Sequence, residues 1–514
     1  MGTPAPLSGP DFAQGVEGSK VPDGGMLLGH RGGEAVLLVR RGTRFTAIGA
    51  TCSHYSGPLA EGLIVGDQVR CPWHHACFDV RTGEASGPGL NPLPCFKTEQ
   101  QGSVIVVGEK LPPKAVTAAR STAPASVLII GGGAAGNSTA EALRREGYQG
   151  AVTILGAENT VPVDRPNLSK DILAGTAPED WVAMRGADFY AEKKIELVLG
   201  VRAVAIDLAA KTVKLSDGTS RGYGALVLAT GADPIALTIP GSDKPHIHTL
   251  RSLADCKAII GKSATAKKAV VVGASFIGLE AAASLRTRGL EVVVVAPDAR
   301  PLEKVMGPQL GDLVRKLHEE KGVTFQLGHT LKEIGDTEVT LDNGTKLPCD
   351  LVVVGIGVRP SIALAEQAGL KIDRGVVVSE FLQTSAPDVY AAGDIARWPD
   401  SYSGKSIRIE HWVVAQRQGE TVARNLLGQK VPFRTVPFFW SQHYDMPINY
   451  VGYAEGWDQL TVAGNVAEKN CLVAYRVAGK IAAIASVYRD GQSLEAEALF
   501  EKNDQAGLEA LLKR

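Results

Sequence analysis

The sequence predicts a multidomain protein: a small all-β domain, then an α/β region with two dinucleotide-binding units, then a C-terminal α+β cap. Residues 12–108 contain short apolar runs separated by turn residues, a pattern typical of β-strands. From residue 125 a strand, a glycine-rich turn and a helix follow one another, and the same series returns 142 residues later. Residues 431–514 return to short apolar runs and end in a helical pattern over 494–513.

Length and charge limit the classes of function. The chain has 514 residues, enough for three or four domains, and a formal net charge of −1. This balance predicts no partner among nucleic acids or anionic membranes. No run of 18 apolar residues occurs, so we expect no membrane span. Residues 1–10 lack the basic start and apolar stretch of a signal peptide. The few scattered cysteines are typical of a reducing compartment, and we expect a cytoplasmic protein.

Two short motifs in the first domain supply four soft metal ligands, separated by sixteen residues: Cys52 with His54, and Cys71 with His74. Two thiolates and two imidazoles suit a [2Fe–2S] cluster in which Cys hold one iron and His the other. The spacing, with a proline after Cys71, resembles the Rieske family. A structural zinc site is the alternative, because Cys₂His₂ also binds Zn²⁺. Zinc sites usually keep like ligands together, whereas here Cys and His alternate.

The residues around these ligands predict a low-potential cluster. High-potential Rieske centres carry a disulfide between the two loops, but here Cys77 has no cysteine in the first loop to pair with. Ala76 and Phe78 stand where those centres place hydroxyl donors. With fewer donors to its sulfurs, the reduced cluster is less stabilised. We expect a potential of roughly −150 mV, the low end of the Rieske range. The neighbouring His75 is expected to be a polar loop residue without a role.

The two glycine-rich turns predict two dinucleotide sites. The first contains Gly131, Gly133 and Gly136, and the second contains Gly273, Ser275 and Gly278. In such turns the first glycine permits the tight bend, the second admits a pyrophosphate, and the third lets helix and strand pack closely. The helix N-terminus then offers unpaired N–H groups to the phosphates. One such motif is weak evidence, but two in register, each followed by a second strand, are strong evidence.

Further motifs in the same order make residues 125–450 resemble the FAD-dependent ferredoxin reductases of oxygenase systems and the apoptosis-inducing-factor-like proteins. These motifs occupy residues 161–170, 228–231, 355–360, 391–394, 411–412, 418–419 and 437–441. With its first domain, the whole chain resembles a Rieske-fused member of the apoptosis-inducing-factor-like branch. The resemblance implies a glutathione-reductase-like fold. We expect a Rieske domain at 12–108, a linker at 109–124, an FAD domain at 125–245 and 376–430, an NAD(P) domain at 246–375 and a cap at 431–514.

The resemblance implies which residues contact each cofactor. Asp394 follows a strand and precedes an expected helix, and the family uses it on the ribityl chain of FAD; an N-cap is the alternative role. Glu158 is the nearest candidate for the ribose acid, and Arg165 for a phosphate or ring-oxygen partner. Other candidates on the flavin side are Thr230, Gly231, His411 and Trp412. Trp440 lies either near the flavin or in the core.

For the second site the resemblance implies that Glu280 pairs with Lys170 beside the flavin. Such a pair, if buried, serves orientation or charge balance; an exposed surface pair is the alternative. Asp298, after the second strand, is the candidate for a ribose hydroxyl and favours NADH over NADPH. Gly355 and Gly357 are further candidates for coenzyme contacts.

Together these features predict an NAD(P)H:acceptor oxidoreductase that passes electrons through FAD to the fused cluster and on to an acceptor protein such as an oxygenase or cytochrome. A disulfide reductase is disfavoured, since no CxxC or CxxxxC follows residue 125. A Rieske oxygenase needs an iron triad, and the late histidines (His318, His329, His411, His443) show no close ligand pairing. An NADH oxidase or peroxidase, and a redox-responsive interaction protein, remain alternatives.

Overall fold

The computed structural model describes residues 7–113 and 123–514. Residues 1–6 of the N-terminal segment and 114–122 of the expected linker therefore lie outside the described residues. Within the described ranges, no helix is both long enough and apolar enough to cross a bilayer.

The first domain consists of two antiparallel sheets. The larger has the order β1-β10-β9-β4-β3-β2, formed by Val16–Glu17, Val104–Lys110, Cys95–Gln101, Arg44–Gly49, Glu34–Arg41 and Met26–Arg31. The smaller contains β5 (Leu63–Val65), β6 (Gln68–Arg70), β7 (Cys77–Asp79) and β8 (Ala85–Ser86). Strand β10 continues two residues into the expected linker. Apolar side chains of β3 face both sides of the sheet and are fully buried, so this strand is the centre of the domain.

The α/β region contains two parallel five-stranded sheets. The first has the order β13-β12-β11-β17-β29, from Ile195–Leu199, Ala151–Gly156, Ser126–Ile130, Ala225–Leu228 and Val389–Ala391. The second has the order β19-β26-β20-β21-β22, from Ile247–Thr249, Leu351–Val354, Lys268–Val272, Glu291–Ala296 and Val323–Leu327. Their central strands are almost continuously Val, Ile and Leu, as strands covered on both faces require.

Helices cover these sheets. Helix α1 (Ala134–Arg145) follows β11 and packs on α8 (Trp412–Leu426), while α5 (Phe276–Thr287) follows β20 in the equivalent place. The remaining helices of the region are α2 (Asp171–Ala174), α3 (Ala187–Glu192), α4 (Leu253–Ser263), α6 (Glu303–Glu320) and α7 (Ala363–Gln367). Each unit also has a three-stranded antiparallel excursion. In the first unit it is formed by β14 (Ala203–Asp207), β15 (Thr212–Leu215) and β16 (Ser220–Gly222), and in the second by β23 (Leu331–Ile334), β24 (Glu338–Leu341) and β25 (Lys346–Pro348).

Three short strands lie at the edges of the region. They are β28 (Val376–Val377), β30 (Ala396–Pro399) and β31 (Ser406–Ile407), and another pair, β18 (Ala232–Pro234) with β27 (Val358–Pro360), connects the two units. The expectation that a helix follows Asp394 is wrong, because β30 follows it after a turn.

The cap is an antiparallel sheet with two helices. Its order is β32-β33-β36-β35-β34, from Phe438–His443, Met446–Gly452, Lys480–Val487, Asn470–Val477 and Gln459–Asn465. The expectation of a single closing helix over 494–513 is wrong. The structure has two helices there, α9 (Asp490–Glu501) and α10 (Gln505–Leu511). They are separate because Asn503 has a φ of 53° and the Asp504 carboxylate then caps a new helix by accepting from the Gly507 N–H.

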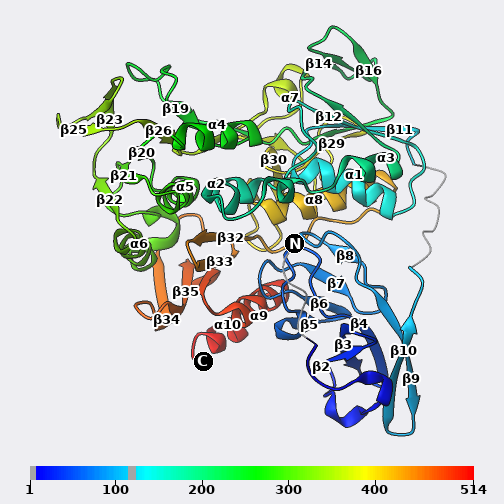
Figure 1. Cartoon of the computed structure of the whole chain (residues 1–514). Coiled ribbons are helices and arrows are strands. Elements are labelled where there is room, and N and C mark those ends of the chain that lie inside the picture. The colour runs from blue at the N-terminus through cyan, green and yellow to red at the C-terminus, as the bar shows by residue number, and fades with distance from the viewer. Residues whose placement is uncertain (1–6, 114–122) are drawn as a thin grey trace.

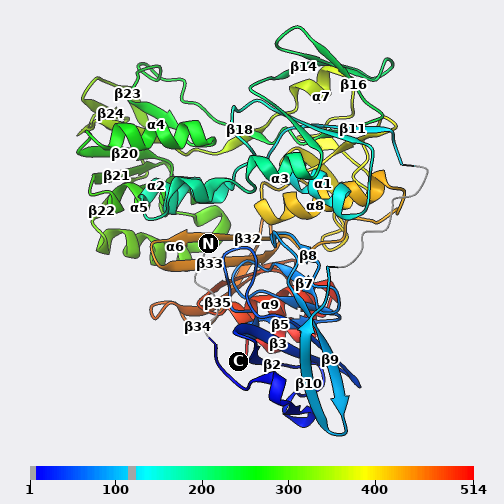
Figure 2. The ribbon, with the colours of Figure 1, turned by 45° about the vertical axis from the view of Figure 1, so that its right-hand side comes forward.

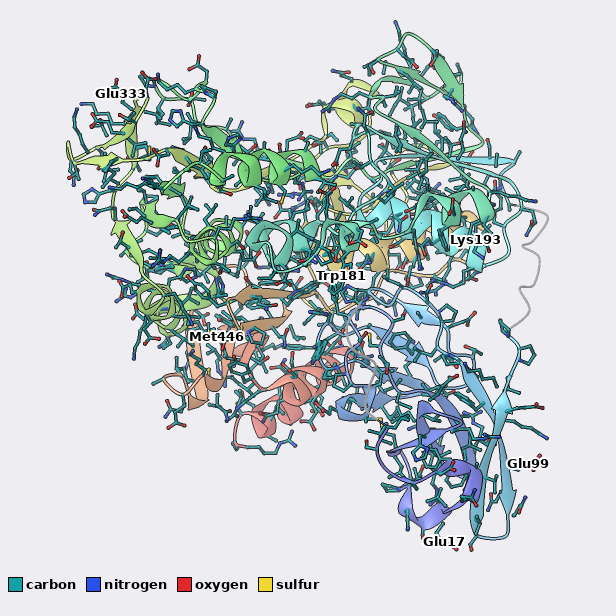
Figure 3. The ribbon with its side chains drawn as sticks, viewed as in Figure 1. Glu17, Glu99, Trp181, Lys193, Glu333 and Met446 are labelled. Carbon is teal, nitrogen blue, oxygen red and sulfur yellow. The ribbon has the colours of Figure 1, made fainter. Side chains whose placement is uncertain are left out.

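The cap lies between the other two parts. Figure 1 shows the first domain below the α/β region, with α9 beside β5, and Figure 2 shows the same neighbours after rotation. In Figure 3 the labelled Glu17 and Glu99 mark the outer end of the first domain, and Glu333 marks the opposite end of the molecule. The loops that carry the four soft ligands, at 51–58 and 71–76, lie between strands of the first domain.

Candidate functional site

Two tight turns present the predicted cluster ligands. The Cys52 N–H donates to the Gly57 carbonyl at 2.9 Å, and the Cys71 N–H donates to the Ala76 carbonyl at 2.8 Å. Each turn contains one residue with positive φ, Ser56 at 60° and His75 at 57°. A Cβ on Gly57 would lie 2.6 Å from the Cys71 sulfur, so only glycine lets the two loops approach this closely.

The four ligands form one sulfur pair and one nitrogen pair. The Nδ1 atoms of His54 and His74 are 3.2 Å apart, and the Cys52 and Cys71 thiols are hydrogen-bonded to each other. Burial lowers the pKa of His54 to about 3 and that of His74 well below its usual value, which keeps both imidazoles neutral, as metal ligands must be. In the described ranges no three or more His, Cys, Asp or Glu converge as ligands of one metal ion. Two separate pairs fit a cluster of two irons.

The surroundings of the loops are apolar. Ala76 and Phe78 are fully buried, and Cys77 is buried with its thiol directed at the His75 carbonyl, 3.4 Å away. All seven cysteines are free. The later ones, Cys256, Cys349 and Cys471, are each buried singly.

A cavity of about 1080 Å³ lies at the first glycine-rich turn. Of the residues that the sequence analysis assigns to cofactors, the cavity is lined by Gly131, Gly133, Glu158, Arg165, Lys170, Thr230, Gly231, Ser275, Glu280, Asp394, His411 and Trp412. A Cβ on Gly133 would meet no protein atom closer than 4.0 Å. The protein's own packing therefore does not require glycine there, whereas a pyrophosphate against the backbone does. The residues present fit FAD.

The other two glycines of this turn have packing reasons. Gly131 has a φ of 111°, and a Cβ there would lie 2.1 Å from the Ala229 carbonyl oxygen. A Cβ on Gly136 would lie 1.9 Å from the Gly131 carbonyl oxygen, so Gly136 serves helix–strand packing and does not line the cavity.

Four charged side chains that line the cavity, two of each sign, are linked to one another. Arg165 contacts the Glu158 carboxylate and donates to the Arg251 carbonyl at 2.9 Å. Arg251 in turn pairs with Asp394 at 2.7 Å. Sequence reasoning missed Arg251, because it lies in a loop outside every recognised motif.

The second glycine-rich turn contributes less to the cavity. Ser275 lines it, but Gly273, Gly278, Gly355, Gly357 and Asp298 do not. A Cβ on Gly273 would lie 2.3 Å from the Gly355 carbonyl oxygen, and one on Gly355 3.0 Å from Gly278, so these three glycines let α5 pack closely on its sheet. Asp298 pairs with Lys304 at 2.9 Å.

Lys170 and Glu280 form a buried ion pair at the cavity wall. Their charged atoms are 2.8 Å apart, and their side chains are 13% and 5% exposed. The same carboxylate accepts from the hydroxyls of Ser169 and Ser441, each at 2.6 Å. The pair is therefore not the exposed surface pair considered as an alternative.

Trp440 connects the cavity with the cluster ligands. It lines the cavity, and its ring centroid is 4.3 Å from that of His74 and 6.3 Å from that of His54. Beside it, the Tyr55 hydroxyl donates to the Asp164 carboxylate. We call His54, Tyr55, His74, Asp164 and Trp440 the pocket edge. Of the two positions considered for Trp440, the structure has the one at the cavity.

A second contact holds the first domain on the cap and α8. Glu497 is fully buried and pairs with His75 at 2.7 Å, Arg417 at 2.8 Å and Arg70 at 3.2 Å, while Arg70 also pairs with Glu501 at 2.7 Å. We call these five residues the cap junction. The expectation that His75 is a polar loop residue without a role is wrong: it is 0% exposed and stacks on Phe438 with ring centroids 3.8 Å apart.

Two of the late histidines, which the sequence does not place together, are in contact. His318 Nε2 lies 3.2 Å from His443 Nδ1, and both residues are fully buried. The contact joins α6 to the end of β32, which are 125 residues apart in sequence, a separation that spacing arguments do not reach.

Comparisons with known proteins match all three parts. Residues 125–419 match the pyridine nucleotide-disulphide oxidoreductase family, residues 15–97 the Rieske [2Fe-2S] domain, and residues 438–513 the reductase C-terminal domain. Apoptosis-inducing factor 3 of Mus musculus is 32% identical over 88% of this chain and 78% of its own length. Rhodocoxin reductase of Rhodococcus erythropolis is 37% identical over 66% of this chain and 81% of its own length. The crystal structure of the covalent putidaredoxin reductase–putidaredoxin complex has a TM-score of 0.71 at 34% identity, over 73% of this chain and 93% of that chain.

Proposed function

The chain belongs to the pyridine nucleotide-disulphide oxidoreductase family, and from this premise we propose that it is an NAD(P)H:acceptor oxidoreductase of the ferredoxin-reductase type with its own Rieske domain. When bound, FAD supplies hydride acceptance from NAD(P)H and the [2Fe–2S] cluster supplies single-electron transfer. The acceptor is a protein such as an oxygenase or cytochrome. One observation supports the proposal above all others: Trp440 lines the dinucleotide cavity and lies 4.3 Å from the cluster ligand His74.

The chain's own residues bind and orient the reactants. Gly133 leaves backbone open for a pyrophosphate, and Asp394, oriented by Arg251, offers a carboxylate beside it. Lys170 places a positive charge at the cavity wall, and Glu280 keeps that charge in position. Because both are mostly buried, their interaction is screened little by solvent. The pocket edge places aromatic rings between the cavity and the cluster ligands.

The proposal also covers the domain limits, the cellular location and the potential of the cluster. We infer a Rieske domain at 12–108, an FAD domain at 125–245 and 376–430, an NAD(P) domain at 246–375 and a cap at 431–514. The strand pairings support these limits, since each of the five larger sheets takes its strands from one of these units. We also infer a cytoplasmic location, supported by seven free cysteines. The buried Ala76 and Phe78 support a cluster potential of roughly −150 mV.

An anaerobic titration of the purified holoprotein with NADH and then NADPH tests the proposal. Visible spectra follow the flavin, and electron paramagnetic resonance follows the cluster in the same samples. We expect loss of flavin absorbance together with a Rieske-type signal. Zinc in place of iron, or a flavin that is reduced while the cluster never becomes reduced, would refute the proposal.

A further inference from the structure

A line of buried polar groups leads from Glu280 at the cavity wall to helix α6. Glu280 accepts from the Ser441 hydroxyl at 2.6 Å, Ser441 Oγ is 3.3 Å from His443 Nε2, and His443 Nδ1 is 3.2 Å from His318 Nε2. All four residues are less than 5% exposed. The proposed hydride chemistry assigns no role to Ser441, His443 or His318.

The protons of this line have one consistent arrangement. The Lys170 ammonium and the Gln442 N–H can only donate to Glu280, so both carboxylate oxygens act as acceptors and Ser441 also donates to this carboxylate. Ser441 Oγ must then accept from a proton on His443 Nε2. Burial lowers the pKa of His443 to about 3 and that of His318 well below its usual value. With both rings neutral, His443 Nδ1 accepts from the proton on His318 Nε2. The outermost nitrogen, His318 Nδ1, is left as a bare acceptor, and it has no partner among the described residues.

We propose that Ser441, His443 and His318 are a proton relay that delivers one proton to Glu280 when the cavity receives a hydride, and returns it afterwards. This inference rests on the proposed function. A hydride carries two electrons and one proton, so its arrival adds one negative charge to the cavity. The opposite charges of Lys170 and Glu280 already cancel each other there. The added negative charge attracts a proton to the end of the relay at the cavity wall.

The transfer balances at every atom. A proton that enters past the half-buried Tyr444 binds the buried His318 Nδ1, and the proton on His318 Nε2 passes to His443 Nδ1. The proton on His443 Nε2 passes to Ser441 Oγ, whose own proton passes to Glu280. Each relay group ends neutral, and every hydrogen bond now points outward, so the relay is set to release one proton when the electrons leave. One proton in and one proton out per cycle fits a cavity that gains and loses one charge.

Few other charged or titratable groups face the relay. Lys170 lies at the Glu280 end and also acts on His443. At the other end the half-buried Tyr444 lies beside His318 with ring centroids 5.2 Å apart, and Lys321 and Arg286 face Tyr444. These cations oppose a stable positive charge on the imidazoles, which favours passage of the proton over its storage there.

The first test reads the proton positions without turnover. Nitrogen NMR of the holoprotein labelled with ¹⁵N-histidine, assigned with His318→Gln and His443→Gln, reports the tautomer of each ring. We expect both rings to be neutral with the proton on Nε2 at neutral pH. A cationic ring, or a proton on Nδ1 of either ring, would overturn the proposal even if the protein proved to be an active oxidoreductase.

The second test measures proton uptake with a pH indicator during anaerobic reduction by NADH. In wild type we expect uptake in step with flavin reduction. In His443→Gln and His318→Gln we expect flavin reduction at an unchanged rate and uptake delayed at least about tenfold, since proton-transfer groups commonly contribute more than that. His246→Gln is the matched control, because His246 is also buried but lies outside the relay. Uptake that stays in step in both relay variants would overturn the relay. Failure of NADH to reduce the flavin would instead count against the proposed function, and the NMR test would still apply.

Discussion

The pocket edge and the cap junction both hold the Rieske domain against the rest of the chain, but they use different chemistry. The pocket edge is mostly aromatic, with Trp440 against His74. The cap junction is ionic, with Glu497 fully buried between Arg70 and Arg417. His74 and His75 are consecutive, yet His74 contacts Trp440 at the cavity while His75 contacts Phe438 and Glu497, because His75 has a φ of 57° and turns the chain.

This difference in chemistry gives the two regions different roles: the pocket edge transfers electrons, and the cap junction positions the Rieske domain. A buried ion pair adds little net stability compared with an apolar contact, but it is strongly destabilised if its partners separate or if one is removed. The cap junction is therefore suited to specify one position of the domain. The pocket edge, where no charged pair crosses between the cluster ligands and Trp440, is suited to transfer electrons. Substitutions in the pocket edge and substitutions in the cap junction should therefore change different measurements.

The largest expected effect comes from removing a cluster ligand at the pocket edge. In His54→Cys we expect NADH to reduce the flavin at the wild-type rate while reduction of cytochrome c through the cluster falls to background, because a second imidazole is required on that iron. Stopped-flow spectra and steady-state assays measure the two steps. His329→Cys, at a half-exposed position of the NAD(P) domain, is the control. Equal loss of both steps would contradict separate roles for the cavity and the cluster.

The next effect tests the cap junction. In Glu497→Gln two guanidinium groups lose their buried counter-charge, and we expect a loss of about 3–5 kcal/mol from the free energy that holds the domain in place. Limited proteolysis in increasing urea should detach the Rieske domain at lower urea, and cluster reduction should slow while flavin reduction does not. The matched control is Glu509→Gln in α10, which removes the partner of Arg476 from a more exposed ion pair. Equal behaviour of the two variants would mean that the junction does not position the domain.

Acid should weaken the junction in a defined direction. Burial alone would raise the pKa of Glu497, but the charge of Arg417 and its neighbours outweighs burial and holds the pKa well below the ordinary 4.5. The folded protein then binds fewer protons at this site than the unfolded chain. The stabilisation is complete above pH 4.5 and is lost as the pH falls below that value. The difference in thermal midpoint between wild type and Glu497→Gln should therefore shrink below pH 4.5, and a difference that grows in acid would contradict this sign.

The smallest effect concerns Trp440. In Trp440→Leu we expect cluster reduction to slow about tenfold, equivalent to roughly 1.4 kcal/mol of barrier, because an aromatic contact with His74 is lost. Trp440→Phe should recover part of the rate, and Trp457→Phe, elsewhere in the cap, should change nothing. A full wild-type rate in Trp440→Leu would remove this residue from the path.

The sequence predicts those parts of the site that are formed by residues close together in the chain. The four cluster ligands lie within 23 residues, and both glycine-rich turns precede their own helices, so local spacing identifies them. The cap junction joins His75 to Glu497 over 422 residues, and the relay joins α6 to β32; neither leaves a local pattern. Backbone packing requires Gly273, Gly278 and Gly355, a reason for glycine that sequence cannot separate from coenzyme binding.

The central claim is that the flavin cavity and the cluster of one chain are held together by these two regions. The most direct measurement is the rate of cluster reduction after anaerobic mixing of the holoprotein with saturating NADH, over a series of protein dilutions. The account predicts a rate constant that does not change with protein concentration, as for transfer within one molecule. A rate proportional to protein concentration would show that electrons pass between molecules, and would contradict the account.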